Sequence, residues 1–302
     1  MMNKEIRRVL IIYNPNAGAL HGNLNVIRRL EASLKADGLM VVAQATTCGG
    51  DATRLAREAV TANYDALIVC GGDGTINEAA QELAGSATVL GVLPCGTANV
   101  FAKELKLTCD PQKVSQLIAA GRTRTISLGR AIQDDTGWQR YFLLMAGIGL
   151  DAAMVRNVNL PLKRRIGEGA YFVAAMDYLM RWPLAPFALR VDGRDYEAAY
   201  AIISNSPGYG GGFRIAPGAR MDDDKLNVCI FNSRNRLDYI GYAALALTGR
   251  HTGCAGVTYL EAQQISAEAR PEVFVQLDGE LAGKLPMRFE VVPHALQVIA
   301  AD

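Results

Sequence analysis

Three glycines, an aspartate and a threonine occur together as Gly71-Gly72-Asp73-Gly74-Thr75. The apolar run at 64–69 before them is typical of a strand, and residues 82–84 after them favour a helix. Glycines at a strand-to-helix turn permit positive φ and let bare backbone approach a ligand, and the first N–H groups of a helix favour an anion. The segment therefore predicts a phosphate-binding turn. A plainer interpretation is that Thr75 and Glu78, which have capping-box spacing, only start the helix.

Similar loops follow three other strand-like segments, expected at 8–13, 39–45 and 88–93. The loops are Asn14-Pro15-Asn16-Ala17-Gly18, Thr46-Thr47-Cys48-Gly49-Gly50-Asp51 and Pro94-Cys95-Gly96-Thr97-Ala98-Asn99. Helices are expected between the strands, including one at 52–60 that Asp51 caps. Strands that alternate with helices form parallel sheets, and ligands collect at the carboxyl ends of such strands. The four loops are therefore expected to converge on one site.

Beyond Gly121 the pattern changes to a succession of strands. The strand-like segments are 124–132, 138–146, 188–191, 196–204, 226–231, 257–267, 273–277 and 287–300, and two helices are expected at 167–180 and 237–247. Asp135-Thr136-Gly137 and Asp192-Gly193 are typical of hairpin turns. We therefore predict a parallel α/β domain over residues 1–125 and a mainly antiparallel β-sandwich domain over residues 126–302, whose last strand could return to the first domain.

The composition argues against several classes of partner. The chain has 302 residues, of which 50% are apolar, and 31 Lys and Arg residues nearly balance 30 Asp and Glu residues. The chain therefore has no large net positive charge that would attract nucleic acid or an anionic membrane. The six cysteines include no C-x-x-C pair, which favours reduced thiols. With no signal peptide or membrane span evident, we expect a cytoplasmic protein that is at most peripheral to a membrane.

Four motifs in a fixed order carry a family resemblance. They are Asn14-Pro15-x-x-Gly18, Gly71-Gly72-Asp73-Gly74-Thr75, Gly96-Thr97-x-Asn99-x-Phe101-Ala102 and Asp278-Gly279-Glu280. With a β domain behind them, they resemble the diacylglycerol kinase catalytic family, which includes sphingosine and ceramide kinases and small bacterial lipid kinases. The resemblance covers nearly the whole chain. It implies transfer of the γ-phosphate of ATP to a hydroxyl group of a lipid such as diacylglycerol, in a cleft between the two domains.

The resemblance also implies which residues contact ATP, with Asp73 near the phosphates and their Mg²⁺. The implied contacts are Asn14, Pro15, Asn16, Ala17, Gly18, Thr46, Gly71, Gly72, Asp73, Gly74, Thr75, Ile76, Asn77 and Thr97. Three alternatives stay open. Thr47 competes with Thr46 for its role, Asp73 could be an ordinary turn acid, and Thr97 with Asn99 could merely start a helix.

The late motif Asp278-Gly279-Glu280 has two interpretations. Asp-Gly is among the strongest hairpin-turn signals, so the motif could be only a turn. A lipid alcohol, however, needs a group that accepts its proton as the bond to phosphorus forms, and a carboxylate suits that role. The resemblance implies that Glu280 is this base and that Asp278 supports it or helps to hold a metal ion.

A third acidic segment, Asp222-Asp223-Asp224, resembles the turn that holds a structural Mg²⁺ in the same family. The resemblance implies ligands from the Asp223 carboxylate and from the carbonyl groups of Arg220 and Lys225, since Mg²⁺ prefers oxygen. This chain departs from the family pattern, because Asp224 replaces a glycine and Asn227 replaces an aspartate. A solvated turn is therefore the alternative.

Two segments could concern the lipid. Arg156 and Lys163-Arg164-Arg165 surround Leu160-Pro161-Leu162, and this basic and apolar segment could touch an anionic membrane surface. The apolar residues at 171–180 could line an acyl chain. The plainer interpretations are a solvated loop and a core helix. Whether the protein forms a homodimer is left open.

Three rival functions are compatible with parts of the sequence. NAD kinases share the Gly-Gly-Asp-Gly-Thr motif and a similar domain plan, but the motifs at 96–102 and 278–280 favour the lipid branch. A dehydrogenase is disfavoured, since Gly147-Ile148-Gly149 lacks the third glycine of the dinucleotide fingerprint. A nucleotide-binding regulator without catalysis would agree with the altered Asp224 but not with an intact Glu280. The sequence does not specify the alcohol acceptor.

Overall fold

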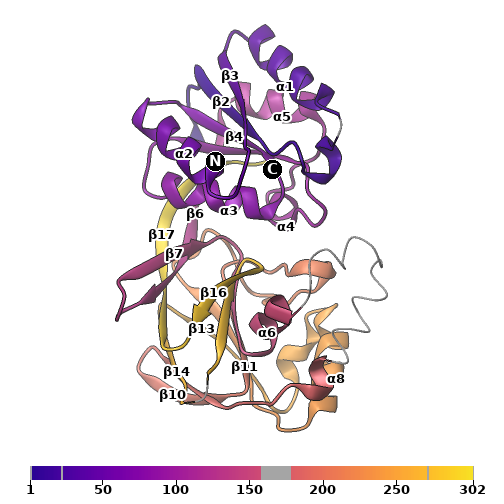
Figure 1. Cartoon of the computed structure of the whole chain (residues 1–302), viewed down its shortest axis with the longest axis vertical. Coiled ribbons are helices and arrows are strands. Elements are labelled where there is room, and N and C mark those ends of the chain that lie inside the picture. The colour runs from indigo at the N-terminus through magenta and orange to yellow at the C-terminus, as the bar shows by residue number, and fades with distance from the viewer. Residues whose placement is uncertain (1, 22, 158–177, 271, 302) are drawn as a thin grey trace. The chain divides into compact units, whose positions relative to one another are not determined.

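The chain divides into two compact units (Figure 1), and its computed structural model describes residues 2–21, 23–157, 178–270 and 272–301. The first unit comprises Met1–Leu128 and Val292–Asp302, and the second comprises Gly129–Val291. The last strand, β17 (Met287–Ile299), therefore contributes its final residues to the first unit. The basic segment around Leu160 and most of the helix expected at 167–180 lie outside the described residues.

The first unit is a parallel sheet with helices between its strands. Strands β2 (Arg8–Tyr13), β3 (Met40–Ala45), β4 (Ala66–Gly71) and β5 (Val89–Pro94) pair in the order β5-β4-β2-β3, and helices α1 (Asn25–Ala36), α2 (Asp51–Thr61) and α3 (Asp73–Leu83) connect them. The expected α/β fold is confirmed. Every residue of β4 and β5 is buried, which explains why these strands are continuous apolar runs rather than alternating ones.

Shorter elements complete this unit. They are β1 (Met2–Asn3), η1 (Gly18–Leu20), α4 (Val100–Glu104), α5 (Pro111–Ala119) and the start of β6 (Arg122–Gln133). The end of β17 lies beside β5 in parallel, with Val298 opposite Leu90. The C-terminal strand therefore extends the parallel sheet at its β5 edge.

The expected cap of helix α2 is wrong. Gly50, in the left-handed conformation at φ 85°, is the N-cap, and Asp51 is the first helical residue. The Asp51 carboxylate instead accepts hydrogen bonds from the hydroxyl and N–H groups of Thr47, which lower the pKa of Asp51. Asp51 therefore shapes the loop before the helix rather than capping the helix.

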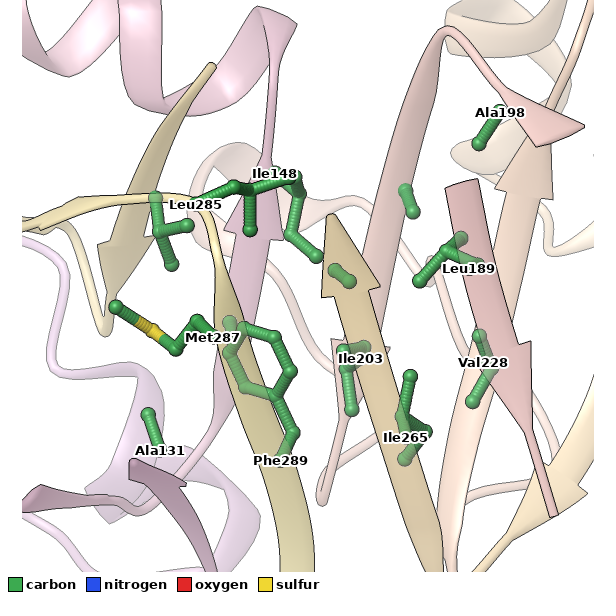
Figure 2. Packing of buried hydrophobic residues seen from close by; sticks show 14 of the residues in the cluster. Ala131, Ile148, Leu189, Ala198, Ile203, Val228, Ile265, Leu285, Met287 and Phe289 are labelled. Carbon is green, nitrogen blue, oxygen red and sulfur yellow. The ribbon is translucent and has the colours of Figure 1, made fainter. Parts of the chain in front are cut away.

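The second unit is a β-sandwich. One sheet is antiparallel in the order β13-β12-β11-β8-β15-β16, formed by β13 (Val257–Ala262), β12 (Leu226–Phe231), β11 (Tyr200–Ser204), β8 (Met145–Ile148), β15 (Phe274–Leu277) and β16 (Glu280–Lys284). In the other sheet β10 (Arg194–Ala198), β9 (Phe187–Val191), β14 (Gln264–Glu268) and β17 are neighbours, and β6 pairs with β7 (Trp138–Phe142). Both sheets contribute to one apolar core (Figure 2), for example Ile203 from the first and Ile265 from the second.

Three expected strands are each divided in two. The run at 138–146 becomes β7 and β8, the run at 196–204 becomes β10 and β11, and the run at 257–267 becomes β13 and β14. In each case the two halves belong to different sheets, as occurs in sandwiches whose strands bend from one sheet into the other. At 257–267 the break has a visible cause, because the Asp192 carboxylate accepts the N–H groups of Gln263 and Gln264.

The described helices of the second unit are short. They are α6 (Leu150–Asn157), α8 (Arg236–Ala246), η2 (Gly210–Gly212) and η3 (Arg250–Gly253), together with a helical turn at 178–181. Asn235 caps α8 by accepting the N–H of Leu237. Within the described part of the chain, no helix combines the length and the apolar character needed to cross a membrane.

Candidate active site

The loops that follow the parallel strands meet at one edge of the first unit's sheet. Backbone hydrogen bonds join them there: the N–H of Asn14 donates to Cys70, the N–H of Thr46 to Tyr13, and the N–H of Cys95 to Gly71, at 3.1, 2.9 and 3.0 Å. The parallel register therefore brings the ends of all four strands together, as the alternation of strands and helices predicts.

A pocket of about 240 Å³ lies at this edge. Its lining residues are Asn14, Asn16, Thr46, Thr47, Cys48, Gly49, Ala52, Thr75 and Glu78. Of the residues predicted to bind nucleotide, the structure thus brings Asn14, Asn16, Thr46 and Thr75 together. Threonine hydroxyls, asparagine amides and a glycine backbone can form many hydrogen bonds without adding charge, which suits a polar small molecule.

Other predicted nucleotide contacts lie elsewhere. Pro15, Ala17 and Gly18 belong to the first loop but are not among the residues that line the pocket. Ile76 and Asn77 are buried on helix α3, with exposed fractions of 0% and 1%. Thr97 is exposed in the loop after β5 and also does not line the pocket. A role for these residues would need a ligand that extends beyond the pocket.

Four lining residues were not predicted to contact nucleotide: Cys48, Gly49, Ala52 and Glu78. Thr47, which was an alternative to Thr46, also lines the pocket. Cys48 and Gly49 continue the loop after β3, so the glycine pair at 49–50 was the available signal. Glu78 carried no such signal, because its spacing from Thr75 suggested a capping box. The capping-box interpretation is wrong: Gly72 is the N-cap of α3, and the Glu78 carboxylate accepts the N–H of Gly50 at 3.0 Å.

The glycines in the motifs at 71–75 and 96–99 allow close packing. A Cβ atom on Gly96 would lie 2.5 Å from the Cα of Gly72, and a Cβ on Gly71 would lie 2.9 Å from the Cβ of Thr75. Neither Gly71, Gly72 nor Gly96 has a positive φ. The positive φ that glycine permits is therefore not used at these three positions, and what they require is the small size of glycine where the loops after β4 and β5 touch.

Asp73 joins those two loops. Its carboxylate accepts the N–H groups of Val100 and Phe101, at 3.2 and 3.1 Å, so it caps helix α4 from the first residue of helix α3. Asn99 braces the loop after β5 from within, since its amide group bonds both the N–H and the carbonyl of Gly96. Each Asp73 oxygen accepts one of these bonds and keeps a further acceptor position.

In the second unit, Asp278 and Gly279 form a two-residue turn between β15 and β16. Their φ angles of 48° and 87° are both positive, as in the tight turns that Asp-Gly favours. The Asp278 carboxylate accepts the N–H groups of Leu143, Leu144 and Met145 at 2.7, 2.9 and 2.9 Å. These bonds explain why the chain leaves one sheet between β7 and β8, and they favour an anchoring role for Asp278.

Glu280 is the first residue of β16 and keeps 44% of its side chain exposed. One of its carboxylate oxygens lies 2.6 Å from a guanidinium nitrogen of Arg140 on β7. The arginine restricts one side of the carboxylate and leaves the other side open to solvent. Nothing in the sequence indicated Arg140, because 140 residues separate it from Glu280.

A buried carboxylate supports the turn that carries Glu280. Asp151, only 5% exposed, accepts hydrogen bonds from the hydroxyl of Tyr209 and from the amide of Gln276. The Gln276 side chain in turn accepts the N–H of Gly279 at 2.6 Å. Burial raises the pKa of Asp151, and the two hydrogen bonds oppose that rise. The sequence did not single out Asp151, although the glycine at 147 leaves the space it needs.

Positively charged side chains already lie close to the acidic turn at 222–224. The guanidinium of Arg220 lies 3.3 Å from the Asp222 carboxylate and 3.7 Å from that of Asp223. Lys225 pairs with Glu261 at 3.3 Å. Among the described residues, no group of three or more acidic, histidine or cysteine side chains could hold a metal ion. A cation bound by Asp223 with the carbonyls of Arg220 and Lys225 would have to compete with that guanidinium, so the turn fits Mg²⁺ poorly.

The fold and its two sites correspond to a kinase of two domains. Residues 8–131 match the family model described as "Diacylglycerol kinase catalytic domain", and residues 145–300 match "YegS C-terminal NAD kinase beta sandwich-like domain". A diacylglycerol kinase of Mycobacterium tuberculosis (strain H37Rv) is 33% identical over 305 residues, which cover 98% of this chain and 96% of the relative. The chain belongs to the diacylglycerol kinase family.

Further relatives agree with that assignment. A diacylglycerol kinase of Bacillus subtilis (strain 168) is 31% identical and covers 97% of this chain and 96% of the relative. The crystal structure of a diacylglycerol kinase from Bacillus anthracis str. Sterne superposes with a TM-score of 0.78, at 25% identity and 99% coverage of both chains. The family, the two-part fold and the kinase class expected from the sequence are therefore confirmed.

Proposed function

We propose that this kinase transfers the γ-phosphate of ATP to a hydroxyl group of a lipid alcohol such as diacylglycerol. The observation that carries the proposal is the polar pocket at the carboxyl ends of the parallel strands, beside the glycine motif at 71–75. Its relatives named diacylglycerol kinase support the lipid as acceptor.

The charges around the pocket suggest how the nucleotide lies. Glu78 places a carboxylate in the pocket lining, which would repel phosphate but can accept hydrogen bonds from ribose hydroxyls or the adenine amino group. The N-terminus of α3 at Gly72 and Asp73 favours anions. The nucleoside would therefore occupy the pocket, and the phosphates would lie along the glycine motif.

Asp73 fits the task of holding Mg²⁺ with the phosphates. The hydrogen bonds that it accepts from two backbone N–H groups keep its carboxylate fixed. Each carboxylate oxygen still has a lone pair with which to bind a metal ion. When bound, Mg²⁺ would supply positive charge against the β- and γ-phosphate oxygens. Glu280 would take the proton from the lipid hydroxyl, and Arg140 would hold the Glu280 carboxylate in place.

The direct test is to incubate the protein with labelled ATP and Mg²⁺ and a panel of lipid alcohols, with NAD as a control acceptor. We expect label in a phospholipid product, with diacylglycerol among the acceptors. Chromatography of the products identifies the acceptor. Label on NAD instead would make the protein an NAD kinase, and the proposed function would then be wrong.

Two exposed cysteines allow the nucleotide site to be mapped without measuring catalysis. Cys48 lines the pocket, whereas Cys109 is also exposed but does not line it. At an ATP concentration ten times its Kd, we expect alkylation of Cys48 by iodoacetamide to slow by about tenfold, because only the free fraction of the protein reacts. Alkylation of Cys109 should be unchanged. Mass spectrometry of the two peptides measures both rates, and equal rates at Cys48 with and without ATP would place the nucleotide elsewhere.

A further inference from the structure

Large exposed apolar side chains gather on one part of the second unit. The described residues include eight such side chains, and four of them are Met180 (49% exposed), Leu237 (61%), Leu245 (38%) and Leu247 (52%). Three lie on or directly after helix α8, which is labelled in Figure 1. Met180 lies on the turn at 178–181.

Two contacts hold the turn at 178–181 beside α8. The guanidinium of Arg236 donates to the carbonyl of Trp182 at 2.9 Å, and the rings of Trp182 and Tyr239 are 5.4 Å apart. We call the four side chains Met180, Leu237, Leu245 and Leu247 the α8 patch.

The outer face of α8 differs from that of an ordinary surface helix. Tyr239, Tyr242 and Ala246 are buried on its inner face. Surface helices usually place charged residues on the opposite face, yet residues 239–249 contain no charged side chain at all. The helix is therefore apolar on the side that it buries and on the side that it exposes. An exposed apolar face of this kind marks an interaction site.

The charges that flank the α8 patch identify the kind of partner. Residues 178–182 and 232–254 contain four arginines, Arg181, Arg234, Arg236 and Arg250, against one acidic residue, Asp238. Asp238 is hydrogen-bonded to Ser233 and Asn235, and the nearby Glu197 lies 3.5 Å from Arg234. An apolar face with a positively charged border fits an anionic lipid bilayer, where leucines enter the acyl boundary and arginines meet the headgroup phosphates. If the same face of a second copy packed against this one, arginines would lie opposite arginines and repel each other.

We propose that the α8 patch docks this kinase onto anionic membranes. The inference rests on the proposed function, since an enzyme that phosphorylates a bilayer lipid must work at the bilayer surface. Docking through α8 would not itself perform chemistry, because neither α8 nor the turn at 178–181 contains a residue assigned to catalysis.

The test is sedimentation with vesicles of phosphatidylcholine alone or with about a third phosphatidylglycerol, in the absence of ATP. The wild-type protein should bind the phosphatidylglycerol vesicles. Leu237→Glu should weaken that binding by about tenfold or more, because it replaces an exposed apolar group that would enter the bilayer with a charge that anionic lipid repels. Met40→Glu is the matched control, because Met40 is also 61% exposed but lies on β3 of the first unit. It should bind as the wild type does.

A second variant tests the charged border. Arg250→Glu, at an exposed residue, should weaken binding to phosphatidylglycerol vesicles, and raised salt should reduce the difference. Failure of the wild-type protein to bind, or equal losses in Leu237→Glu and Met40→Glu, would overturn the proposal. So would loss of self-association in Leu237→Glu with vesicle binding unchanged, which would make the patch an interface between copies. Vesicle binding without lipid phosphorylation would reject the proposed function and leave the docking surface standing.

Discussion

Replacing Glu280 with glutamine is expected to lower kcat by about 10²- to 10⁴-fold, with little change in the KM for ATP. Glutamine keeps the size of the side chain and can still accept a hydrogen bond from Arg140, but it cannot take a proton from the lipid hydroxyl. The ion pair that it removes is partly exposed, so its loss should change the free energy of unfolding by only about 0–1 kcal/mol. Steady-state kinetics and a thermal melt on the same preparation separate the two effects.

Asp278→Asn provides the contrast, because it changes an acid two residues away in the same turn. The Asp278 carboxylate accepts three backbone N–H groups, and an amide has one oxygen to accept them. We expect this variant to lose roughly 2–4 kcal/mol of unfolding free energy, while the molecules that still fold keep most of their kcat. A Glu280→Gln enzyme that turns over at the wild-type rate would remove Glu280 as the base.

Asp73→Ala is expected to abolish turnover and to weaken ATP binding. The substitution leaves the N–H groups of Val100 and Phe101 without their acceptor, so the segments after β4 and β5 lose two of the bonds that hold them together. An unsatisfied backbone donor costs about 1–3 kcal/mol where it is buried. The substitution also removes the carboxylate that we propose as the Mg²⁺ ligand. Kinetics at saturating Mg²⁺, with ATP binding measured by calorimetry, test both consequences.

Asp110→Ala is the matched control for Asp73. Asp110 also caps a helix through its carboxylate, by accepting the N–H of Gln112 at the start of α5, but it lies outside the glycine motif at 71–75. Its loss should cost about 1 kcal/mol of stability and leave kcat unchanged. If Asp73→Ala lost no more activity than Asp110→Ala, Asp73 would be only a helix cap and the Mg²⁺ role would be wrong.

Local sequence patterns were enough to predict the elements that position the site. The strand at 66–71, the glycines after it and helix α3 follow from an apolar run and a strand-to-helix turn, which depend only on neighbours along the chain. The alternation of strands and helices likewise predicted a parallel sheet, and its register brought Asn14, Thr46 and Thr75 to one pocket.

Contacts between distant residues could not be predicted in this way. Glu78 reaches the N–H of Gly50, and Asp278 reaches the N–H groups of 143–145, across separations of 28 and more than 130 residues. Periodicity says which face of an element is apolar, but it does not say which carboxylate will accept which backbone group. For that reason the capping box and the unbroken strand at 138–146 were wrong, although each was a reasonable local pattern.

By itself, the sequence determined the family, the two-part fold and the positions of the glycine motifs, because these depend on hydrophobic periodicity and on short ordered runs. Only the tertiary structure decided that the glycines are required for close packing, that Asp151 and Gln276 support the turn before Glu280, and that α8 exposes an apolar face. The physical reason is the same in each case. Close approach, buried hydrogen bonds and exposure depend on which distant segments lie side by side, and that is a property of the folded chain.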